Sequence, residues 1–426
     1  MKINKILKRL LLLHPKSIDL SLSRIKRLLG ELGNPENKIS NAIQVVGTNG
    51  KHSVCTTLRE IFETAGYTVN LNVSPSIRRF NERYYFSGKH ISDNKLKNLL
   101  LEVESVNNGK SITFHEFICA CFFLHAARNK ADINILESGL FFRLDASNVL
   151  KKNICSIIMP IGIDHKDFLK RGTIDEIVYE KCSHLLGKSK IVVSEQNKNV
   201  LNKIIKNISK NSSEKILFNK QYSYKKNKKN FTYKDKFGTT NFPHPNLLGD
   251  FQISNVATAI ATVRHLSQFK IKNLSIKKAI IKIKNEGRLQ IITKGNLRKF
   301  VKKSNNIIID GAHNALAGHV IKKYLQNISN KKKIIMVLGM MVNKNHKEFI
   351  QIFKNNVHSI VTLDIPNQIN FIKKEKLAQI AISCGIPSKA ENSIKIALKK
   401  ISEKHNNATI LFTGSLYFVG EILNLN

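Results

Sequence analysis

A glycine-rich turn is the first place in this chain where residue types and spacing could do chemistry. The apolar run 43–46 is typical of a buried strand and leads directly into Gly47-Thr48-Asn49-Gly50-Lys51-His52-Ser53, after which a helical pattern begins. Glycines let backbone N–H groups approach phosphate oxygens, a helix N-terminus favours negative charge, and lysine adds a mobile cation. The usual phosphate-loop spacing is not met, because Val45 stands where the first glycine should be. The segment predicts a polyphosphate site, with a plain glycine-containing turn as the alternative.

Two polar side chains stand at the ends of other predicted strands. Glu137 ends the run 133–137, and His165 follows the run 156–161. Parallel α/β sheets bind ligands beyond the carboxyl ends of their strands. A carboxylate and an imidazole, with a hydroxyl, suit a divalent cation beside phosphates. The ordinary alternative for His165 alone is a surface histidine.

The elements that must position these residues alternate along the chain. Apolar runs separated by helical patterns over the first two-thirds indicate parallel βαβ units, and a second series begins near residue 300. We expect an α/β protein with a larger phosphate-loop domain and a smaller second domain, joined near 288–298. Residues 196–245 are rich in Lys and Asn, so peripheral hairpins are expected there, with 225–236 a solvated excursion. The candidate strands are 43–46, 69–73, 133–137, 156–161, 191–194, 307–309, 334–338, 360–363 and 409–412.

Several segments, in order along nearly the whole chain, resemble the motifs of one family. Residues 47–51 resemble the ATP loop shared by the Mur ligases and the folylpolyglutamate synthase/dihydrofolate synthase family. The remaining matches favour the folate family. They are Ser74-Pro75 with Arg79–Arg83, Glu137–Asn148, Ile161–His165, Glu180-Lys181, Gly249 with Gln252 and Asn255, Gly287–Leu289, Asp310–Asn314 and Gly414–Tyr417.

The resemblance implies a domain organisation and a reaction. Residues 1–290 would form a P-loop-containing, parallel-sheet ATP-binding domain with a folate pocket, and 296–426 a Rossmann-like glutamate-ligase domain. ATP would phosphorylate a carboxylate, and the amine of L-glutamate would displace phosphate from the resulting acyl phosphate. The acceptor would be dihydropteroate, a folate, or both.

The resemblance also implies roles for particular residues. Lys51, Lys181 and His165 would be catalytic, and Lys181 matches a lysine that the family carbamylates. Ser74, Glu137 and His165 match magnesium ligands, with two Mg²⁺ ions expected, and His313 and Ser415 match positions that bind glutamate. ATP contacts are expected from Gly47, Thr48, Asn49, Gly50, Lys51, His52, Ser53, Asn255, Arg288 and Asp310. The pteroate group would be bound by Asp19, Leu20, Ser21, Leu22, Thr113, His115, Glu116, Asp145 and Ala146.

The chain also departs from the family pattern. His115 stands where an aromatic is usual, and Phe141-Phe142 replace two glycines. Such glycines permit close approach or unusual dihedrals, so the phenylalanines either strain the backbone or fill space beside Asp145. The other departures are His52, Ser76, Ala315, Asn343 and Asn345. Together these departures leave the alternative that the chain is a catalytically weakened relative of the family.

A formal charge of +40 has two interpretations. One is a basic P-loop ATPase that binds nucleic acid, and the other is lysine spread over solvated surface. The lysines are scattered through all segments, which favours the second, so no specific nucleic-acid partner is expected. No stretch has the length of a membrane span. The six cysteines lack metal spacing and indicate buried thiols in a reducing compartment. We expect a monomeric cytoplasmic enzyme with small-molecule substrates.

Overall fold

The computed structural model describes residues 3–16, 18–329 and 332–426, which form two compact units. The first unit holds the chain up to Gly162, Thr173–Asn246 and Ile253–Ile283. The second holds Ile163–Gly172, Leu247–Gln252 and Lys284–Asn426. The functional division into 1–290 and 296–426 stays a prediction.

The first unit is built on an 8-stranded sheet with the order β4-β3-β2-β5-β1-β6-β7-β8. Strands β2, β5, β1, β6, β7 and β8 pair in parallel, and β3 and β4 add an antiparallel edge. All residues of the central strand β1 are buried, as expected for a parallel strand covered on both faces. The strands are β1 (Ala42–Val46), β2 (Val69–Asn72), β3 (Tyr84–Phe86), β4 (Lys89–His90), β5 (Ile133–Glu137), β6 (Cys155–Ile158), β7 (Lys190–Val193) and β8 (Glu214–Leu217).

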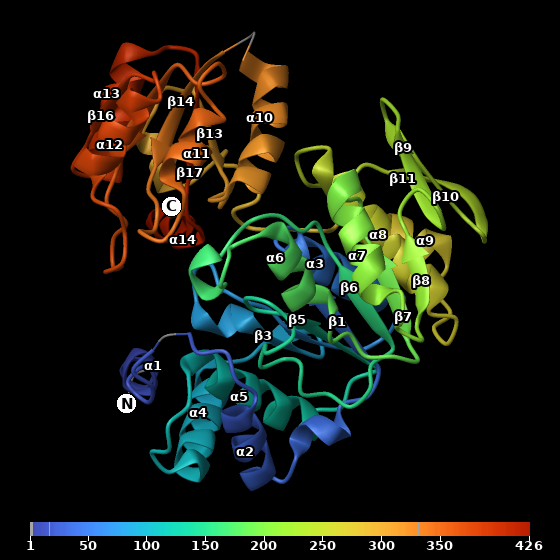
Figure 1. Cartoon of the computed structure of the whole chain (residues 1–426). Helices are drawn as coiled ribbons and strands as arrows, with labels where there is room; N and C mark the ends of the chain where they lie inside the picture. Colours follow the sequence, from blue (N-terminus) through green and yellow to red (C-terminus); the bar gives the residue numbers. More distant parts are fainter. Residues whose placement is uncertain (1–2, 17, 330–331) are drawn as a thin grey trace. The chain divides into compact units, whose positions relative to one another are not determined.

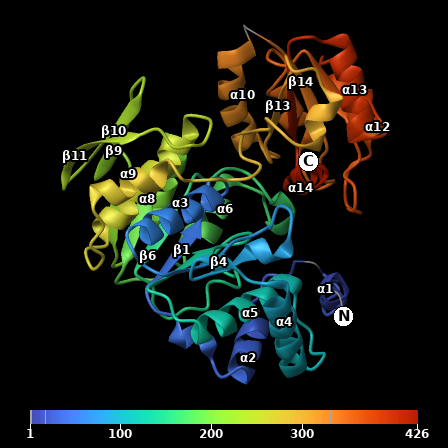
Figure 2. The ribbon, with the colours of Figure 1, turned by 180° about the vertical axis from the view of Figure 1, so that it is seen from behind.

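Helices cover both faces of this sheet. Helices α2, α4 and α5 lie on one face, and α3, α8 and α9 lie on the other (Figures 1 and 2). The first group shares one hydrophobic core with α1, whose Ile6 and Leu10 are fully buried. The helices are α1 (Ile3–Leu10), α2 (Ser23–Glu31), α3 (Lys51–Thr64), α4 (Asp93–Asn107), α5 (Phe114–Arg128), α6 (Ile174–Cys182), α7 (Lys198–Ile208), α8 (Phe251–His265) and α9 (Asn273–Ile280).

A small antiparallel sheet, β9 (Tyr222–Lys226), β10 (Asn230–Asp235) and β11 (Gly238–Pro243), also belongs to the first unit. The expectation that 225–236 is a solvated excursion is wrong, because β10 is the middle strand and Phe231 and Tyr233 are fully buried. Phe231 and Tyr233 alternate with the more exposed Thr232 and Lys234, so the lysine-rich composition of 225–236 hid a period-2 pattern. The buried ion pair between Arg264 Nε and Asp235 Oδ2, at 3.0 Å, ties the sheet to α8.

The second unit has a 6-stranded sheet with the order β12-β13-β17-β14-β15-β16. All its pairings are parallel except that of β12 with β13. Buried side chains of α10, α11 and α12 share one hydrophobic core with strands β13, β14, β15 and β17, so these three helices cover the same face of the sheet. The strands are β12 (Gln290–Ile291), β13 (Asn306–Ile309), β14 (Lys333–Leu338), β15 (Ser359–Thr362), β16 (Ser388–Ala390) and β17 (Ala408–Thr413). The helices are α10 (Ala315–Ser329), α11 (His346–Gln351), α12 (Lys374–Ser383), α13 (Ile394–Lys404) and α14 (Leu416–Leu425). Short 3₁₀ helices are η1 (Pro35–Lys38), η2 (Phe80–Arg83), η3 (Lys166–Phe168) and η4 (Asn296–Phe300).

The α/β fold class expected from the sequence is confirmed. The expected strand 156–161 is too long, because β6 ends at Ile158 and Pro160, which lacks an N–H, follows. All six cysteines are free and buried. Among the helices described, none is long and apolar enough to cross a membrane.

Candidate active site

The glycine-rich turn links β1 to α3 and needs its glycines for two reasons. Gly47 has φ 152° and Gly50 has φ 81°, a region that side chains avoid. A Cβ on Gly47 would lie 2.7 Å from the Cβ of Met159, which directly follows β6. The backbone of the turn therefore packs against the Met159 side chain. Lys51 opens α3 and donates from Nζ to the main-chain oxygens of Gly47 and Thr48, at 3.1 and 3.2 Å. A cation therefore lies over the turn, beside first-turn amides that lack intrahelical acceptors.

Asn255 is brought to this turn from α8. A Cβ on Gly50 would lie 2.8 Å from Asn255 Oδ1, so the buried amide packs directly on the glycine. Ser53, in the first turn of α3, is 2 % exposed. The structure therefore places the turn and Asn255 together, although they are about two hundred residues apart in the sequence.

Glu137 lies beside the turn at the carboxyl end of β5. In the sheet it stands opposite Val45 of β1, two residues before the turn begins. Its Oε2 accepts a hydrogen bond from the main-chain N of Ser74 at 3.2 Å and lies 3.7 Å from Nδ1 of His52. The structure thus gathers a buried carboxylate, the Ser74 backbone and the His52 ring at one edge of the sheet.

Ser74 and Glu137 offer the donor set of a hard divalent cation. A carboxylate and a hydroxyl are oxygen ligands of the kind that Mg²⁺ prefers, and Glu137 is 4 % exposed. The third predicted ligand, His165, belongs to the second unit, where its Nε2 lies 3.8 Å from Asp164 Oδ2. Across the described residues, no three or more His, Cys, Asp or Glu side chains form a group that could hold a metal. The oxygen pair Ser74 and Glu137 therefore carries the fit to Mg²⁺.

Lys181 reaches the same turn from α6. Its side chain is 3 % exposed, and Nζ donates to the main-chain oxygens of Gly47 at 3.0 Å and Leu140 at 2.8 Å. The Phe141 ring lies 5.5 Å from Nζ, within cation–π range. A buried lysine held by carbonyls is uncommon away from functional sites.

The residues predicted to bind pteroate converge on the N-terminus of α5. Thr113 and Glu116 form a capping box, in which each side chain bonds the backbone N–H of the other. Arg24 of α2 donates from Nε to Glu116 Oε2 at 2.9 Å and from Nη1 to Asp19 Oδ2 at 2.7 Å. Sequence reasoning missed Arg24. Leu20, Ser21 and Leu22 follow Asp19 and are half-buried.

His115, beside the capping box, contacts Asp145. Its Nε2 lies 3.4 Å from Asp145 Oδ2 and 3.8 Å from the Cys119 Sγ. The ring fits because residue 139 is glycine, where a Cβ would lie 2.8 Å from His115 Nε2. Burial disfavours the imidazolium, but Cys119 and Asp145 outweigh it and raise the pKa of His115 well above its ordinary value. Despite burial, His115 and Ser147 lower the pKa of Asp145 to about 2.

The two phenylalanines at 141 and 142 do not strain the backbone. Neither has positive φ, and both rings are buried, at 1 % and 0 % exposure. The main-chain N of Phe142 donates to Glu180 O at 3.1 Å, which ties the segment to α6. The strain alternative is therefore wrong, because these positions adopt dihedrals open to any residue.

The second unit brings Arg288 and Asp310 to one place. A Cβ on Gly311 would lie 2.9 Å from Arg288 Nη1, so the guanidinium packs on this glycine. Asp310 accepts hydrogen bonds from Leu289 N and Ala312 N, both at 2.8 Å. Burial raises the pKa of Asp310 against the opposing charge of Arg288.

Asp164 is the centre of a polar cluster that the sequence predictions did not include. It accepts from Lys344 Nζ at 2.7 Å and from Asn314 Nδ2 at 2.9 Å, and His313 Nε2 lies 3.5 Å away. Despite burial, His313, His165 and Lys344 hold the pKa of Asp164 well below its usual range. The motif Ile161–His165 could have identified Asp164 from the sequence. Its partners could not be identified in this way, because they lie about 150 residues or more away.

Ser415 lies between β17 and α14 in the second unit. It is 3 % exposed, and its Oγ accepts from Tyr417 N at 3.2 Å, which caps α14. His313 Nδ1 lies 2.9 Å from Gly311 O. The glutamate role predicted for Ser415 and His313 stays a prediction.

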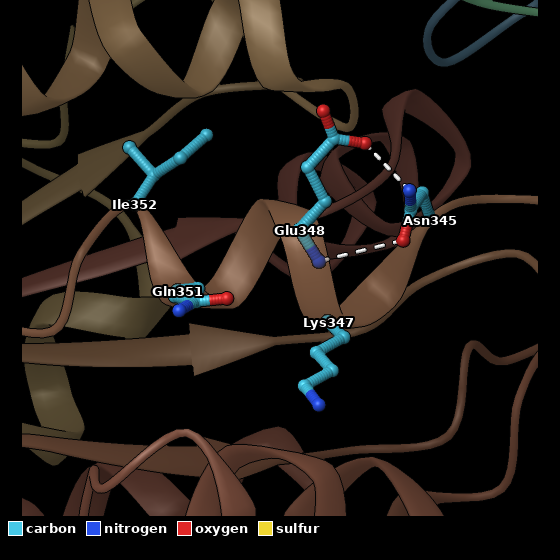
Figure 3. A pocket seen from close by; sticks show the side chains of 5 residues that line it. All are labelled: Asn345, Lys347, Glu348, Gln351 and Ile352. Atoms are coloured by element: carbon cyan, nitrogen blue, oxygen red, sulfur yellow. Dashed lines mark hydrogen bonds between the residues drawn. The ribbon is translucent and has the colours of Figure 1, made fainter.

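A shallow pocket of about 440 Å³ lies along α11 in the second unit (Figure 3). Asn345 caps this helix, because its Oδ1 accepts from Glu348 N while its Nδ2 donates to Glu348 Oε2. Asn caps helices about as well as Asp, so this departure leaves the local structure intact. The pocket is lined by Asn345, Lys347, Glu348, Gln351 and Ile352.

Two family models match the chain. Residues 45–263 match the Mur ligase middle domain, and residues 293–425 match the C-terminal domain of dihydrofolate synthetase. The first match includes the glycine-rich turn, Glu137, Lys181 and Asn255. The second includes Asp310, His313 and Ser415.

Relatives that match nearly the whole chain are named dihydrofolate synthase/folylpolyglutamate synthase. The chain is 32 % identical to dihydrofolate synthase/folylpolyglutamate synthase of Buchnera aphidicola (Acyrthosiphon pisum), over 95 % of this chain and 94 % of the relative. The Bacillus subtilis protein of that name is 28 % identical, over 94 % of each chain. Among solved structures, folylpolyglutamate synthase of Thermotoga maritima aligns with a TM-score of 0.80 at 26 % identity, over 99 % of this chain and 96 % of that one. Escherichia coli FolC aligns with a TM-score of 0.86 at 24 % identity, over 100 % and 97 %. The chain belongs to the dihydrofolate synthase/folylpolyglutamate synthase family of the Mur ligase superfamily.

Proposed function

We propose that this protein uses ATP to join L-glutamate to dihydropteroate, to folates, or to both, through an acyl phosphate. The observation that carries the proposal is the set of groups around the glycine-rich turn. Lys51 and Lys181 both donate to Gly47 O, and the buried carboxylate of Glu137 lies one strand away. A lysine over a phosphate-type turn, with a metal-type carboxylate beside it, suits transfer of a phosphoryl group.

The relatives support the same reaction. Those named above are dihydrofolate and folylpolyglutamate synthases. Escherichia coli FolC was solved with DHPP and ADP, and the Yersinia pestis enzyme with AMPPNP and Mn. We infer that this chain likewise binds a nucleotide with a divalent metal and a pteroate-type acceptor.

The first chemical step is phosphorylation of the acceptor. A carboxylate oxygen forms a bond to the γ-phosphorus while the bond to ADP breaks, and ADP leaves with the electron pair. Lys51 and the turn amides hold the phosphates and offset their charge. The glutamate amine then attacks the acyl carbon, and phosphate leaves with its electron pair as the amine loses a proton.

Metal would enter this site at Ser74 and Glu137, with His165 as the third ligand. We propose two Mg²⁺ ions, which when bound neutralise phosphate charge. Glu137 already lies within 3.7 Å of His52, so that ring would adjust to share the carboxylate. Asn255, Arg288 and Asp310 would hold the rest of the nucleotide.

We also propose that Lys181 is carbamylated in the working enzyme. Its nitrogen contacts two carbonyl oxygens, an arrangement that suits an ammonium. A carbamate keeps a single N–H, so carbamylation would release one of these contacts and add a carboxylate beside the turn. A neutral amine is the form that reacts with CO₂.

Acceptor and glutamate would use different parts of the chain. We assign residues 1–290 to ATP and the acceptor, with the pteroate group near Asp145 and the N-terminus of α5. Residues 296–426 would serve glutamate through His313 and Ser415. Six free and buried cysteines support a reducing compartment such as the cytoplasm, where we propose that the enzyme acts as a monomer.

ADP release measured with each reactant omitted in turn tests this function. The proposal expects ADP only when magnesium, glutamate and a pteroate-type acceptor are present together. Equal release without an acceptor, or release stimulated by DNA alone, would instead favour a basic P-loop ATPase.

A further inference from the structure

Arg24 joins the loop before its own helix to the N-terminus of α5, 92 positions away in the sequence. From α2 its Nη1 reaches Asp19 Oδ2 at 2.7 Å, and its Nη2 reaches Asp19 O at 2.8 Å. Its Nε reaches Glu116 Oε2 at 2.9 Å, the oxygen that also accepts from Thr113 N and Oγ1. One guanidinium therefore fixes the loop before α2 against the capping box of α5.

These segments all belong to the acceptor site under the proposed function. Asp19 opens the segment 19–22, Thr113 and Glu116 cap α5, and His115 between them contacts Asp145. We propose that Arg24 is a positioning residue for the pteroate acceptor, which sets the segment 19–22 at the N-terminus of α5. This inference rests on the proposed function.

The geometry requires an arginine. All three guanidinium nitrogens are used, on two sides, and a lysine has one nitrogen that cannot span both carboxylates. Glu116 is 3 % exposed, so its charge depends on Arg24, its only ion-pair partner in the part of the chain that the structure describes. A lysine at position 24 would still neutralise Glu116 but would release the backbone and side chain of Asp19.

Arg27 supplies a matched control on the same helix. It donates to Glu31 Oε2 at 2.9 Å, Asn107 Oδ1 at 2.8 Å and Ser111 O at 3.5 Å. It too ties α2 to the segment before α5, but through residues outside the predicted acceptor set. Arg27→Lys thus measures how acceptor KM changes when the contacts of α2 are weakened outside the predicted acceptor site.

The test compares Arg24→Lys with Arg27→Lys in the full chain. KM for dihydropteroate, ATP and glutamate, kcat, and the thermal midpoint are measured for both. Loss of contacts to a charged group predicts a rise of about tenfold or more in acceptor KM for Arg24→Lys. ATP KM should stay within about twofold, and Arg27→Lys should leave acceptor KM unchanged.

A second pair of variants covers the case in which Arg24→Lys does not fold. Arg24→Met combined with Glu116→Gln removes the buried charge together with its partner. Adding Asp19→Asn to this variant should raise acceptor KM less than Asp19→Asn does in the wild type, because the contact is already lost.

The outcomes separate two failures. An active wild type whose Arg24→Lys variant keeps its acceptor KM, or raises the KM of all three substrates alike, overturns the role of Arg24 alone. The role of Arg24 is also overturned if Asp19→Asn raises acceptor KM by the same factor in the wild type and in the Arg24→Met, Glu116→Gln variant. A wild type that neither binds nor glutamylates any pteroate acceptor overturns the proposed function, and the role of Arg24 with it.

Discussion

Lys181 Nζ lies 3.0 Å from the main-chain oxygen of Gly47, across 134 positions of sequence. The turn that follows β1 is therefore contacted by its own lysine, Lys51, and by a second lysine from α6. Glu137 ends β5, the strand beside β1, and Ser74 follows β2, the next strand in the sheet. The site is assembled from the carboxyl ends of neighbouring parallel strands and from the helices that follow them.

Lys51→Ala should abolish turnover and leave the fold intact. Loss of a phosphate-contacting cation in a closed site costs roughly 3 kcal/mol or more in the transition state, about a hundredfold in rate. Steady-state ADP release and a thermal melt measure the two effects. Lys198→Ala is the matched control, because Lys198 also opens a helix but is exposed. Near-normal turnover of folded Lys51→Ala would mean that the loop is misassigned.

Lys181 should carry a carbamate when metal and bicarbonate are present. With ¹³C-bicarbonate, NMR should show a carbamate signal in the wild type that Lys181→Arg lacks. Lys181→Arg keeps a cation near Gly47 O, so it should remain folded while losing turnover. A fully active enzyme with no such signal would contradict the carbamate.

His115→Phe should change how stability depends on pH. The raised pKa of His115 means that its pairing with Asp145 stabilises the fold fully below the unfolded-state value, about 6.5. That contribution is lost as pH rises through the raised pKa of the folded state. Thermal midpoints from pH 5 upward should therefore fall more steeply in the wild type than in His115→Phe. Parallel profiles would show that the pair is not charged.

Phe141→Gly combined with Phe142→Gly should lower the thermal midpoint. Each buried ring removed costs roughly 3–5 kcal/mol, and no positive φ is relieved in return. We expect weaker acceptor binding with ATP affinity little changed, measured at a temperature where the variant is folded. A more stable and equally active variant would contradict this account of the two rings.

Much of the fold could be predicted from the sequence, because parallel strands read as short apolar runs. The strand before Gly47 and the strand ending at Glu137 were identified this way, and both directly carry site residues. Hairpins were expected in 196–245, but the burial of Phe231 and Tyr233 was not, because exposed lysines stand on both sides of them in the sequence. The high lysine content of 225–236 suggested exposure and concealed the alternation of buried and exposed side chains along β10.

The candidate site was less accessible to sequence reasoning where it depends on long-range side-chain contacts. Arg24 looks like an ordinary residue of an amphipathic helix until Glu116, 92 positions later, comes within hydrogen-bond distance. Asp164 likewise meets Lys344 across 180 positions. Phe141 and Phe142 could not be judged without their dihedrals. Local pattern identifies groups at strand ends, but the fold alone decides which groups meet.

The mass of the acceptor after turnover tests most directly whether the protein joins L-glutamate to a pteroate-type acceptor. Purified protein is incubated with ATP, Mg²⁺, L-glutamate and dihydropteroate, and both ADP and the acceptor products are quantified. The account predicts a product larger by one glutamyl residue, formed in equal amount with ADP and absent when glutamate is omitted. ADP formed while dihydropteroate and each folate tested stay unchanged in mass would contradict it.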